Sequence, residues 1–480
     1  MVVNSVIFWL FFLIVLLLYY SAFLKENNRQ NIILLFASYF FYWYAGGLRL
    51  VALLIFTTIV FYYLGIIISR YNGSNEKKAS CITTLGVVIG IGQLLYFKYF
   101  NFFLESLSDC LGFMGLNTNW SSFTIIIPIG VSFYTFKLIS YLIEIHRESM
   151  PPCKNIVSFA TYISFFPTIL SGPIDRPSPF IQQLTKSRSF IYSNISEGCK
   201  RILWGMFLKM CVADNLVAFT DLAFNNYSSV GSTTLITASI FYAFQLYTDF
   251  SGYTEMAIGV SMILGLRIQE NFHRPFFAHD MAEYWRRWHI SLTNWLTDYL
   301  FTPLSLTLRN WGVYGSYIAI LVNLFVIGMW HGANWAYAVF GIYHGILLVI
   351  VSATNKKRKT IEKKHSLKNN ALYQNTRVIL TFILIVIGDT IFRADSATDV
   401  LGYIHHMFGP LGAVNGDIPL FSVLCIILLL FKEYKDEHEM NIHFLHSKKL
   451  VVKVITAYIL LMSIFFMGNT EGQQFIYFQF

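Results

Sequence analysis

The sequence predicts an all-α membrane protein that crosses the bilayer many times. Hydrophobic residues make up 55% of the 480 residues and charged residues only 13%, well below the roughly 25% that soluble domains carry. The apolar residues gather in runs that approach the roughly 20 residues needed to span about 30 Å of hydrocarbon. Their number predicts about eleven transmembrane helices, with the shorter runs forming re-entrant or interfacial helices.

The first apolar run, from Val6 to Tyr20, follows no basic residue and precedes no small-x-small cleavage site. We therefore expect a retained helix rather than a removed signal peptide, and no soluble domain at either end of the chain. The remaining apolar runs lie near residues 32–45, 49–69, 82–104, 123–145, 155–171, 202–222, 233–248, 253–266, 314–331, 333–353, 375–392, 418–431 and 451–467.

The net charge of +9 does not indicate a nucleic-acid-binding protein. Lys and Arg fall mainly in short connections between apolar runs, where the positive-inside rule accounts for them. The connections that hold Lys25, Arg70 and Arg147 alternate with residues 106–122, which contain no Lys or Arg, so we expect the former to face the cytoplasm. The basic cluster at Lys356–Lys359 is expected in another cytoplasmic loop, in contact with anionic membrane lipids.

Gly172-Pro173 and Pro177-Ser178-Pro179 interrupt the chain just after the apolar run at 155–171. Helices rarely continue through this combination of residues. Irregular backbone at membrane depth is tolerated only where it is buried in protein or lines a wet cavity. Two interpretations stay open: a re-entrant or interfacial element beside an internal chamber, in which Pro173 has a structural role, or an ordinary cytoplasmic loop.

Asp249 begins the sequence Asp-Phe-Ser-Gly between the apolar runs at 233–248 and 253–266. Such a sequence is typical of a turn from one helix into the next, with the carboxylate capping backbone donors at a helix start. We therefore expect a structural role for Asp249.

The stretch from Tyr284 to His344 concentrates polarity that lipid does not tolerate. Three tryptophans, two adjacent arginines and a histidine fall within its first dozen residues, and each charge at bilayer depth costs about 2.5–3.5 kcal/mol. Guanidinium groups bind phosphate through a planar fork, so Arg286 and Arg287 are candidates for holding the phosphates of a large anionic donor. Interfacial anchoring beside the aromatic residues is the alternative.

His289 and His331 are the candidate catalytic residues. A turn expected around residues 309–312 lies midway between them, so a hairpin with arms of equal length would bring the two to similar depth. One straight helix would instead hold them about 60 Å apart. His344 is expected to have a packing role. The polar residues that share a helix face with His331 are Asn323 and Asn334.

A histidine pair of this kind suits acyl transfer from a thioester to a hydroxyl. Imidazole can take the hydroxyl proton near neutral pH, while a second group stabilises charge that develops on the thioester carbonyl. The sequence contains no nucleophile-elbow Ser or Cys and no His-Glu-x-x-His zinc pattern, and its six cysteines show no paired short spacing. We expect direct or histidine-assisted transfer without a metal or a permanently bound cofactor.

The motifs Trp285–Leu292 (Trp-Arg-Arg-Trp-His-Ile-Ser-Leu) and Trp330-His331-Gly332 resemble those of the membrane-bound O-acyltransferase (MBOAT) family, in particular its bacterial polysaccharide-acetylating branch. The resemblance extends to Pro128–Phe136, Ser171–Ile174, Asp249–Tyr253, Phe392–Ala394 and Phe475–Phe478. It implies one MBOAT domain over residues 1–480, built around a central tunnel. Its parts would be N-terminal helices at 1–120, a catalytic core at 121–394 and C-terminal helices at 395–480.

The resemblance also implies a function. Acetyl-CoA would be the cytoplasmic donor substrate, with His331 the principal catalytic residue and His289 also implicated. Acetyl would cross the bacterial cytoplasmic (inner) membrane for O-acetylation of an extracytoplasmic polysaccharide, alginate-like or peptidoglycan. A separate periplasmic or surface partner of the SGNH-hydrolase type would complete the transfer. The candidate donor-binding or tunnel-lining residues are Trp285, Arg286, Arg287, Trp288, Trp330, Asn323 and Asn334.

Other functions stay open at this point. A D-alanyl transferase for teichoic acid belongs to the same branch, although the apolar runs after Phe392–Ala394 look more like the alginate and peptidoglycan types. A protein- or lipid-acylating relative would need a lateral opening for a long acyl chain. A transporter or flippase would also show many spans and broken helices, but the two halves show no corresponding broken segments.

Overall fold

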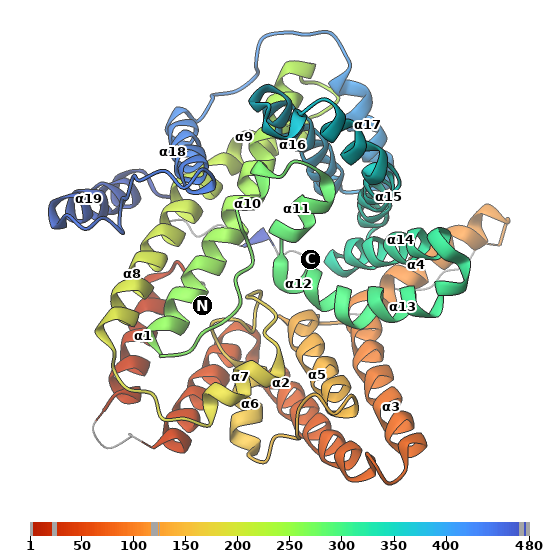
Figure 1. Ribbon diagram of the computed structural model, residues 1–480, viewed down its shortest axis with the longest axis vertical. Coiled ribbons are helices and arrows are strands. Elements are labelled where there is room, and N and C mark those ends of the chain that lie inside the picture. Colours follow the sequence, from red (N-terminus) through yellow and green to blue (C-terminus); the bar gives the residue numbers. More distant parts are fainter. Residues whose placement is uncertain (1–2, 22–25, 117–122, 124, 470–474, 477–480) are drawn as a thin grey trace. The chain divides into compact units, whose positions relative to one another are not determined.

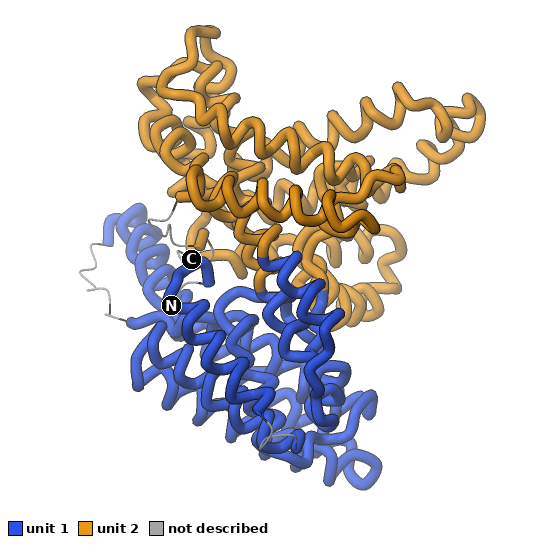
Figure 2. Tube along the Cα trace, turned by 90° about the vertical axis from the view of Figure 1, so that its left-hand side faces the viewer, with its two compact units in different colours: residues 1–202, 257–269 blue, residues 203–256, 270–480 orange. Residues whose placement is uncertain are grey.

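The computed structural model describes residues 3–21, 26–116, 123, 125–469 and 475–476. These residues form helices and connections, with no strand among them (Figure 1). Lys25, Tyr477 and Phe478, on which part of the sequence interpretation depends, lie outside the described residues, as do residues 117–122. The chain divides into unit 1, Met1–Ile202 with Ala257–Gln269, and unit 2, Leu203–Met256 with Glu270–Phe480 (Figure 2).

Seven helices among the described residues are long and apolar enough to cross a membrane. They confirm an all-α polytopic membrane protein, while the count of about eleven spans stays a prediction. The seven are Asn27–Tyr71, Glu76–Phe113, Tyr192–Asn225, Arg309–His331, Trp335–Lys364, Ala371–Arg393 and Leu450–Met467.

Unit 1 is built mainly from the first eight α-helices. The apolar runs predicted at 32–45 and 49–69 join in the single helix α2, which is interrupted at Gly47 (φ +78°). Glycine adopts this left-handed conformation without the steric cost that a side chain adds, which explains why the kink falls there. The helices are α1 (Val6–Tyr19), α2 (Asn27–Tyr71), α3 (Glu76–Leu94), α4 (Phe100–Phe113), α5 (Val131–His146), α6 (Ile156–Ser164), α7 (Pro177–Leu184) and most of α8 (Tyr192–Phe207).

The core of unit 1 surrounds α5, which is buried along most of its length. A Cβ atom on Gly65 of α2 would lie 2.5 Å from the Tyr141 ring, and one on Gly86 of α3 would lie 2.2 Å from a Leu142 methyl. Glycine at these positions therefore lets α2 and α3 approach α5 closely, as small residues do in membrane helix packing.

The Gly-Pro segment after α6 is irregular and buried. Residues 165–176 form turns without a helix, and Pro173 is buried within unit 1. The backbone is held in place by hydrogen bonds, because the Tyr162 hydroxyl donates to the Asp175 carbonyl at 3.0 Å and the Gln269 N–H donates to the Asp175 carboxylate at 3.0 Å. Of the two interpretations above, this geometry favours an irregular element enclosed in protein.

Unit 2 holds the remaining helices. The predicted turn at 309–312 is present, because a short 3-10 turn (Arg309–Trp311) and Gly312 (φ +57°) separate α13 from α14. The helices are α9 (Asp214–Asn225), α10 (Ser232–Ile263, whose last turns lie in unit 1), α11 (Met281–Arg287), α12 (Ile290–Leu296), α13 (Thr302–Thr307), α14 (Gly312–His331), α15 (Trp335–Lys364), α16 (Ala371–Arg393), α17 (Ala397–Met407), α18 (Leu420–Glu437) and α19 (Leu450–Met467).

The turn expected after Asp249 is wrong. Helix α10 runs without a break from Ser232 to Ile263, so Asp249 lies in its interior and caps no helix start. Gly252 instead lies at a close contact between two helices. A Cβ atom there would lie 2.8 Å from the Gly205 carbonyl oxygen. The glycine pair allows α8 and α10 to touch through their backbones.

Helices α14 and α15 form a tight antiparallel hairpin. A Cβ atom on Gly328 would lie 2.2 Å from the Tyr337 carbonyl oxygen, and one on Gly341 would lie 2.5 Å from the Leu324 carbonyl oxygen. The Asn334 side chain caps α15 by accepting a hydrogen bond of 2.8 Å from the Ala336 N–H. The hairpin turn follows His331 directly, so this histidine sits at the last residue of α14.

Candidate functional site

His289 lies at a strained corner between α11 and α12. Its backbone is left-handed (φ +44°), which is uncommon for a residue with a side chain and concentrates at functional sites. Asn271 fixes the corner, because its carbonyl accepts from the Ile290 N–H at 2.9 Å and its side chain accepts from the Ser291 N–H at 3.1 Å. These two hydrogen bonds hold the backbone directly after His289, at the start of α12.

His289 and His331 both pack against the indole ring of Trp330. The ring centre of Trp330 lies 5.8 Å from that of His289 and 5.2 Å from that of His331. Only 1% of His289 and 4% of His331 is exposed. The structure thus brings together two residues that are 42 positions apart in the sequence, in a buried site within unit 2.

Aromatic rings form the walls of this site. Phe250 of α10 meets His289 edge to face at 4.7 Å, and Phe392 of α16 meets His331 at 5.0 Å. Because burial removes the imidazole from water, the pKa of His289 falls to about 3. His289 is therefore neutral at physiological pH, with one ring nitrogen that accepts hydrogen bonds and one that donates.

The two candidate arginines, Arg286 and Arg287, have different environments in the structure. Arg286 is exposed. The Arg287 guanidinium is already paired with Glu283 at 2.6 Å and with both carboxylate oxygens of Glu437, at 2.7 and 3.1 Å. These carboxylates occupy the fork that would bind a phosphate, so only Arg286 presents its guanidinium to solvent.

Arg287 belongs to a network of ion pairs that the sequence interpretation missed. Asp280, which caps α11, pairs with Arg358 of α15 at 2.8 Å and with Arg377 of α16 at 3.3 Å. Although partial burial opposes the change, hydrogen bonds from the Glu283 N–H and from Arg358 lower the pKa of Asp280. The network ties α11 to α15 and α16, so it sets the direction in which the chain enters the His289 corner.

The remaining candidates take different positions. Trp288 is buried and stacks on Tyr284, with ring centres 5.6 Å apart. Asn323 is buried on α14, two turns before His331. The Asn334 side chain donates to the Asp395 carbonyl as well as capping α15, so its polar atoms serve the hairpin turn.

A buried ion triad accounts for Asp249. The Lys209 ammonium lies 2.5 Å from the Asp249 carboxylate and 2.7 Å from that of Asp214, and all three side chains are almost fully buried. The second Asp249 oxygen accepts a hydrogen bond of 2.8 Å from the Ile476 N–H. Lys209 was missed, although a lysine inside the apolar run at 202–222 is a sequence signal for a buried counter-charge.

The triad also supports the histidine site. It holds the chain at Ile476, and the preceding residue, Phe475, stacks on Tyr253 at 5.0 Å and meets Phe250 at 5.7 Å. Phe250 is the ring that contacts His289. Asp249 is therefore connected to His289 through successive contacts of Ile476, Phe475 and Phe250.

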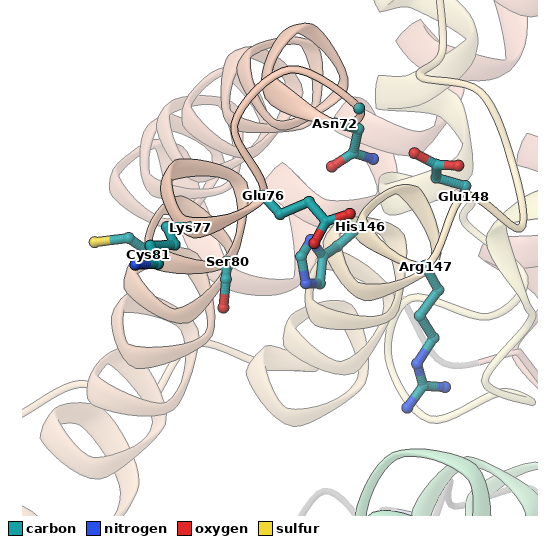
Figure 3. A pocket seen from close by; sticks show the side chains of 9 residues that line it. Asn72, Glu76, Lys77, Ser80, Cys81, His146, Arg147 and Glu148 are labelled. Atoms are coloured by element: carbon teal, nitrogen blue, oxygen red, sulfur yellow. The ribbon is translucent and has the colours of Figure 1, made fainter.

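Unit 1 contains a polar pocket of its own, with a volume of about 750 Å³ (Figure 3). It lies where α2 ends, α3 begins and α5 ends. Figure 3 shows the Glu76 carboxylate directed toward the His146 imidazole, while Arg147 points away. Acidic and basic side chains alternate around it, so its charge does not select an anionic ligand. The lining residues are Asn72, Gly73, Glu76, Lys77, Ser80, Cys81, His146, Arg147 and Glu148.

The structure is that of an all-α membrane protein with two buried histidines, and comparison with known proteins identifies its family. Residues 154–387 match the model of the MBOAT, membrane-bound O-acyltransferase family. This match contains α11, α12, α14 and α15, and with them both histidines. The chain belongs to the membrane-bound O-acyltransferase family.

Three relatives give the comparison more detail. The chain is 36% identical to the protein named probable alginate O-acetylase AlgI of Pseudomonas aeruginosa, over 68% of this chain and 59% of that protein. It is 29% identical to a peptidoglycan O-acetyltransferase of Helicobacter pylori, over 68% and 64%. It is 32% identical to a teichoic acid D-alanyltransferase of Streptococcus thermophilus, over 55% and 68%. The matched region spans about three fifths of the alginate relatives' length.

Proposed function

We propose that this chain is a membrane O-acyltransferase that takes acetyl from cytoplasmic acetyl-CoA and passes it across the bacterial cytoplasmic membrane. The final acceptor is a hydroxyl group of an extracytoplasmic polysaccharide, alginate-like or peptidoglycan. The observation that carries the proposal is the pair of buried histidines against one indole, His289 and His331 on Trp330. The family supports the acyl transfer, and the names of the relatives support the acetyl group and the polymer.

The chemistry requires a neutral imidazole that can accept a proton. His331 takes the proton of the attacking hydroxyl as its oxygen forms a bond to the thioester carbonyl. The carbon–sulfur bond then breaks, and the imidazolium returns the proton to the departing thiolate, so that an ester and a free thiol result. His289 donates a ring N–H to the carbonyl oxygen and so stabilises the negative charge that develops there.

The donor enters from the basic end of α15. The lysines there, including Lys356, Lys359 and Lys363, are exposed, as expected for a helix end at an anionic cytoplasmic surface. On the opposite side, a separate acetyltransferase of the SGNH-hydrolase type receives the acetyl group and completes its transfer to the polymer.

Teichoic acid D-alanylation is the second candidate function. The D-alanyltransferase of Streptococcus thermophilus, at 32% identity, supports it. The acetyl reading is favoured because the alginate relatives match at 35–36% identity over a larger share of this chain. The two functions differ in donor, since D-alanyl transfer uses a protein carrier.

The test is turnover of radiolabelled acetyl-CoA by purified protein in detergent, with envelope extract as the source of acceptor and partner. We expect the wild type to release CoA, His331→Ala to release almost none and His289→Ala to be strongly impaired. His365→Ala, at the exposed end of α15, is the matched control. Wild-type protein that ignores acetyl-CoA but accepts D-alanyl carrier protein would move the function to the second candidate.

A further inference from the structure

His344 is buried without a hydrogen-bond partner. It lies on α15 and is 1% exposed, and neither of its ring nitrogens has a partner among the described residues. The indole N–H of Trp285 also lacks one there. The two rings face each other at right angles, with centres 5.3 Å apart. Unsatisfied buried polar groups are rare in native proteins and destabilise them, so two adjacent ones point to a ligand rather than to the packing role expected from the sequence.

His344 lies on the donor side of His331. A single ring, Phe340, separates the two imidazoles, with its centre 4.5 Å from that of His344 and 6.1 Å from that of His331. From His344, α15 continues for about 21 Å at 1.5 Å per residue before it reaches Arg358 in the basic segment. A thioester donor that enters at that end therefore comes to the level of His344 before its carbonyl comes to His331.

The orientation of the His344 ring is fixed by its neighbours. A Cβ atom on Gly388 of α16 would lie 2.4 Å from its Nε2 atom. Tyr284 stacks against the ring at 6.2 Å with an angle of 19° between the planes, and Tyr343 meets it edge to face at 5.2 Å. The imidazole is thus preorganised in an aromatic cage that also contains the Trp285 N–H.

We propose that His344 and Trp285 hold an amide group of the donor's pantetheine arm, which makes them positioning residues for the thioester. This inference rests on the acetyl-CoA donor proposed above. A secondary amide offers one carbonyl acceptor and one N–H donor, which match the indole N–H and an imidazole nitrogen. The aromatic walls suit the methylene groups on either side of the amide, and no charge is required.

The experiment compares three acetyl donors: acetyl-CoA, acetyl-pantetheine, which lacks the nucleotide, and S-acetyl-mercaptoethanol, which lacks any amide. Kinetics are measured for His344→Phe, for Trp285→Phe, which deletes the N–H but keeps an aromatic ring, and for Gly388→Ala, which displaces the imidazole. We expect KM to rise about tenfold for the two amide donors, equivalent to about 1.4 kcal/mol, and to stay unchanged for the amide-free donor.

The controls are His365→Phe on the exposed end of α15 and Gly92→Ala on α3, where a Cβ atom meets nothing within 4 Å. Variants that lose activity equally on all three donors, or that keep the wild-type KM for acetyl-pantetheine, overturn the inference. Trp285→Phe decides the matter if His344→Phe does not fold. Wild-type protein that turns over none of the three donors refutes the acetyltransferase function instead, so the two failures are distinguishable.

Discussion

Unit 2 contains two buried polar clusters that are built on opposite principles. In the triad, the Lys209 ammonium forms ion pairs with both Asp214 and Asp249, at 2.7 and 2.5 Å. In the histidine cluster, aromatic rings pack against His289, His331 and His344. The first cluster is held together by direct ion pairs, whereas the second places imidazole rings among aromatic walls, as expected where a substrate is to be bound.

Under the proposed function, the triad stabilises the fold and the histidines carry the chemistry. Breaking a buried ion pair leaves an uncompensated charge, which destabilises the fold. Removing the His331 imidazole costs packing and, under the proposed function, also takes away the group that moves a proton. Substitutions in the two clusters should therefore separate folded yield from turnover.

The largest effect is expected for His331→Ala. The rate of acetyl transfer should fall by about 10²–10⁴-fold, because that is the usual contribution of a positioned general base. The thermal unfolding midpoint in detergent should stay close to that of the wild type. A variant that unfolds early and keeps its turnover per folded molecule would reverse the assignment of His331 to chemistry.

Lys209→Met should mainly affect stability. Two carboxylates would share one buried space without a counter-charge, and the free energy of unfolding should fall by about 3–5 kcal/mol. The measurement is the yield of monodisperse protein and its thermal midpoint. Asp249→Asn, which keeps the shape and leaves Lys209 paired with Asp214, should be milder. Normal stability of Lys209→Met would show that the triad is not the anchor we describe.

Arg286→Gln should change substrate binding, whereas Arg287→Gln should change stability. Arg287 is held by Glu283 and Glu437, so its replacement should lower the unfolding midpoint with little change in KM. Arg286 is exposed, so its replacement should raise the KM for acetyl-CoA severalfold and leave that for acetyl-pantetheine unchanged. Equal effects of the two substitutions on KM would show that both guanidinium groups contact the donor phosphates.

The sequence predicted the parts of this arrangement that depend on local chemistry. Apolar runs gave the helices, Gly312 marked the turn midway between the histidines, and that symmetry correctly indicated that the two rings could meet. Gly252 was misread as a turn, because a glycine in an apolar run looks the same whether it breaks a helix or lets another helix approach.

Contacts between distant residues could not be predicted in this way. The partner of Arg287 at Glu437 is 150 residues away, and nothing in the local sequence of either residue names the other. His344 was assigned to packing because its neighbours in the sequence are Tyr343 and Gly345. Its unpaired nitrogens become visible only when α11 and α16 are in place around it.

The smallest effect is expected from pH, which acts on the ion pairs formed by the carboxylates of α11. Asp280 and Glu283 have lowered pKa values in the folded protein: partial burial opposes the change, but hydrogen bonds and arginine charges outweigh it. Their contribution to stability is therefore complete above the unfolded pKa values, about 4, and is lost as the pH falls through the folded values. Because the network is partly exposed, we expect a contribution of about 0.2–1 kcal/mol per pair. Unfolding midpoints of wild type and Asp280→Asn, measured from pH 7 to pH 3, should differ most at pH 7 and converge in acid. A difference of the same size from pH 7 to pH 3 would show that the loss comes from the α11 cap and not from the ion pairs.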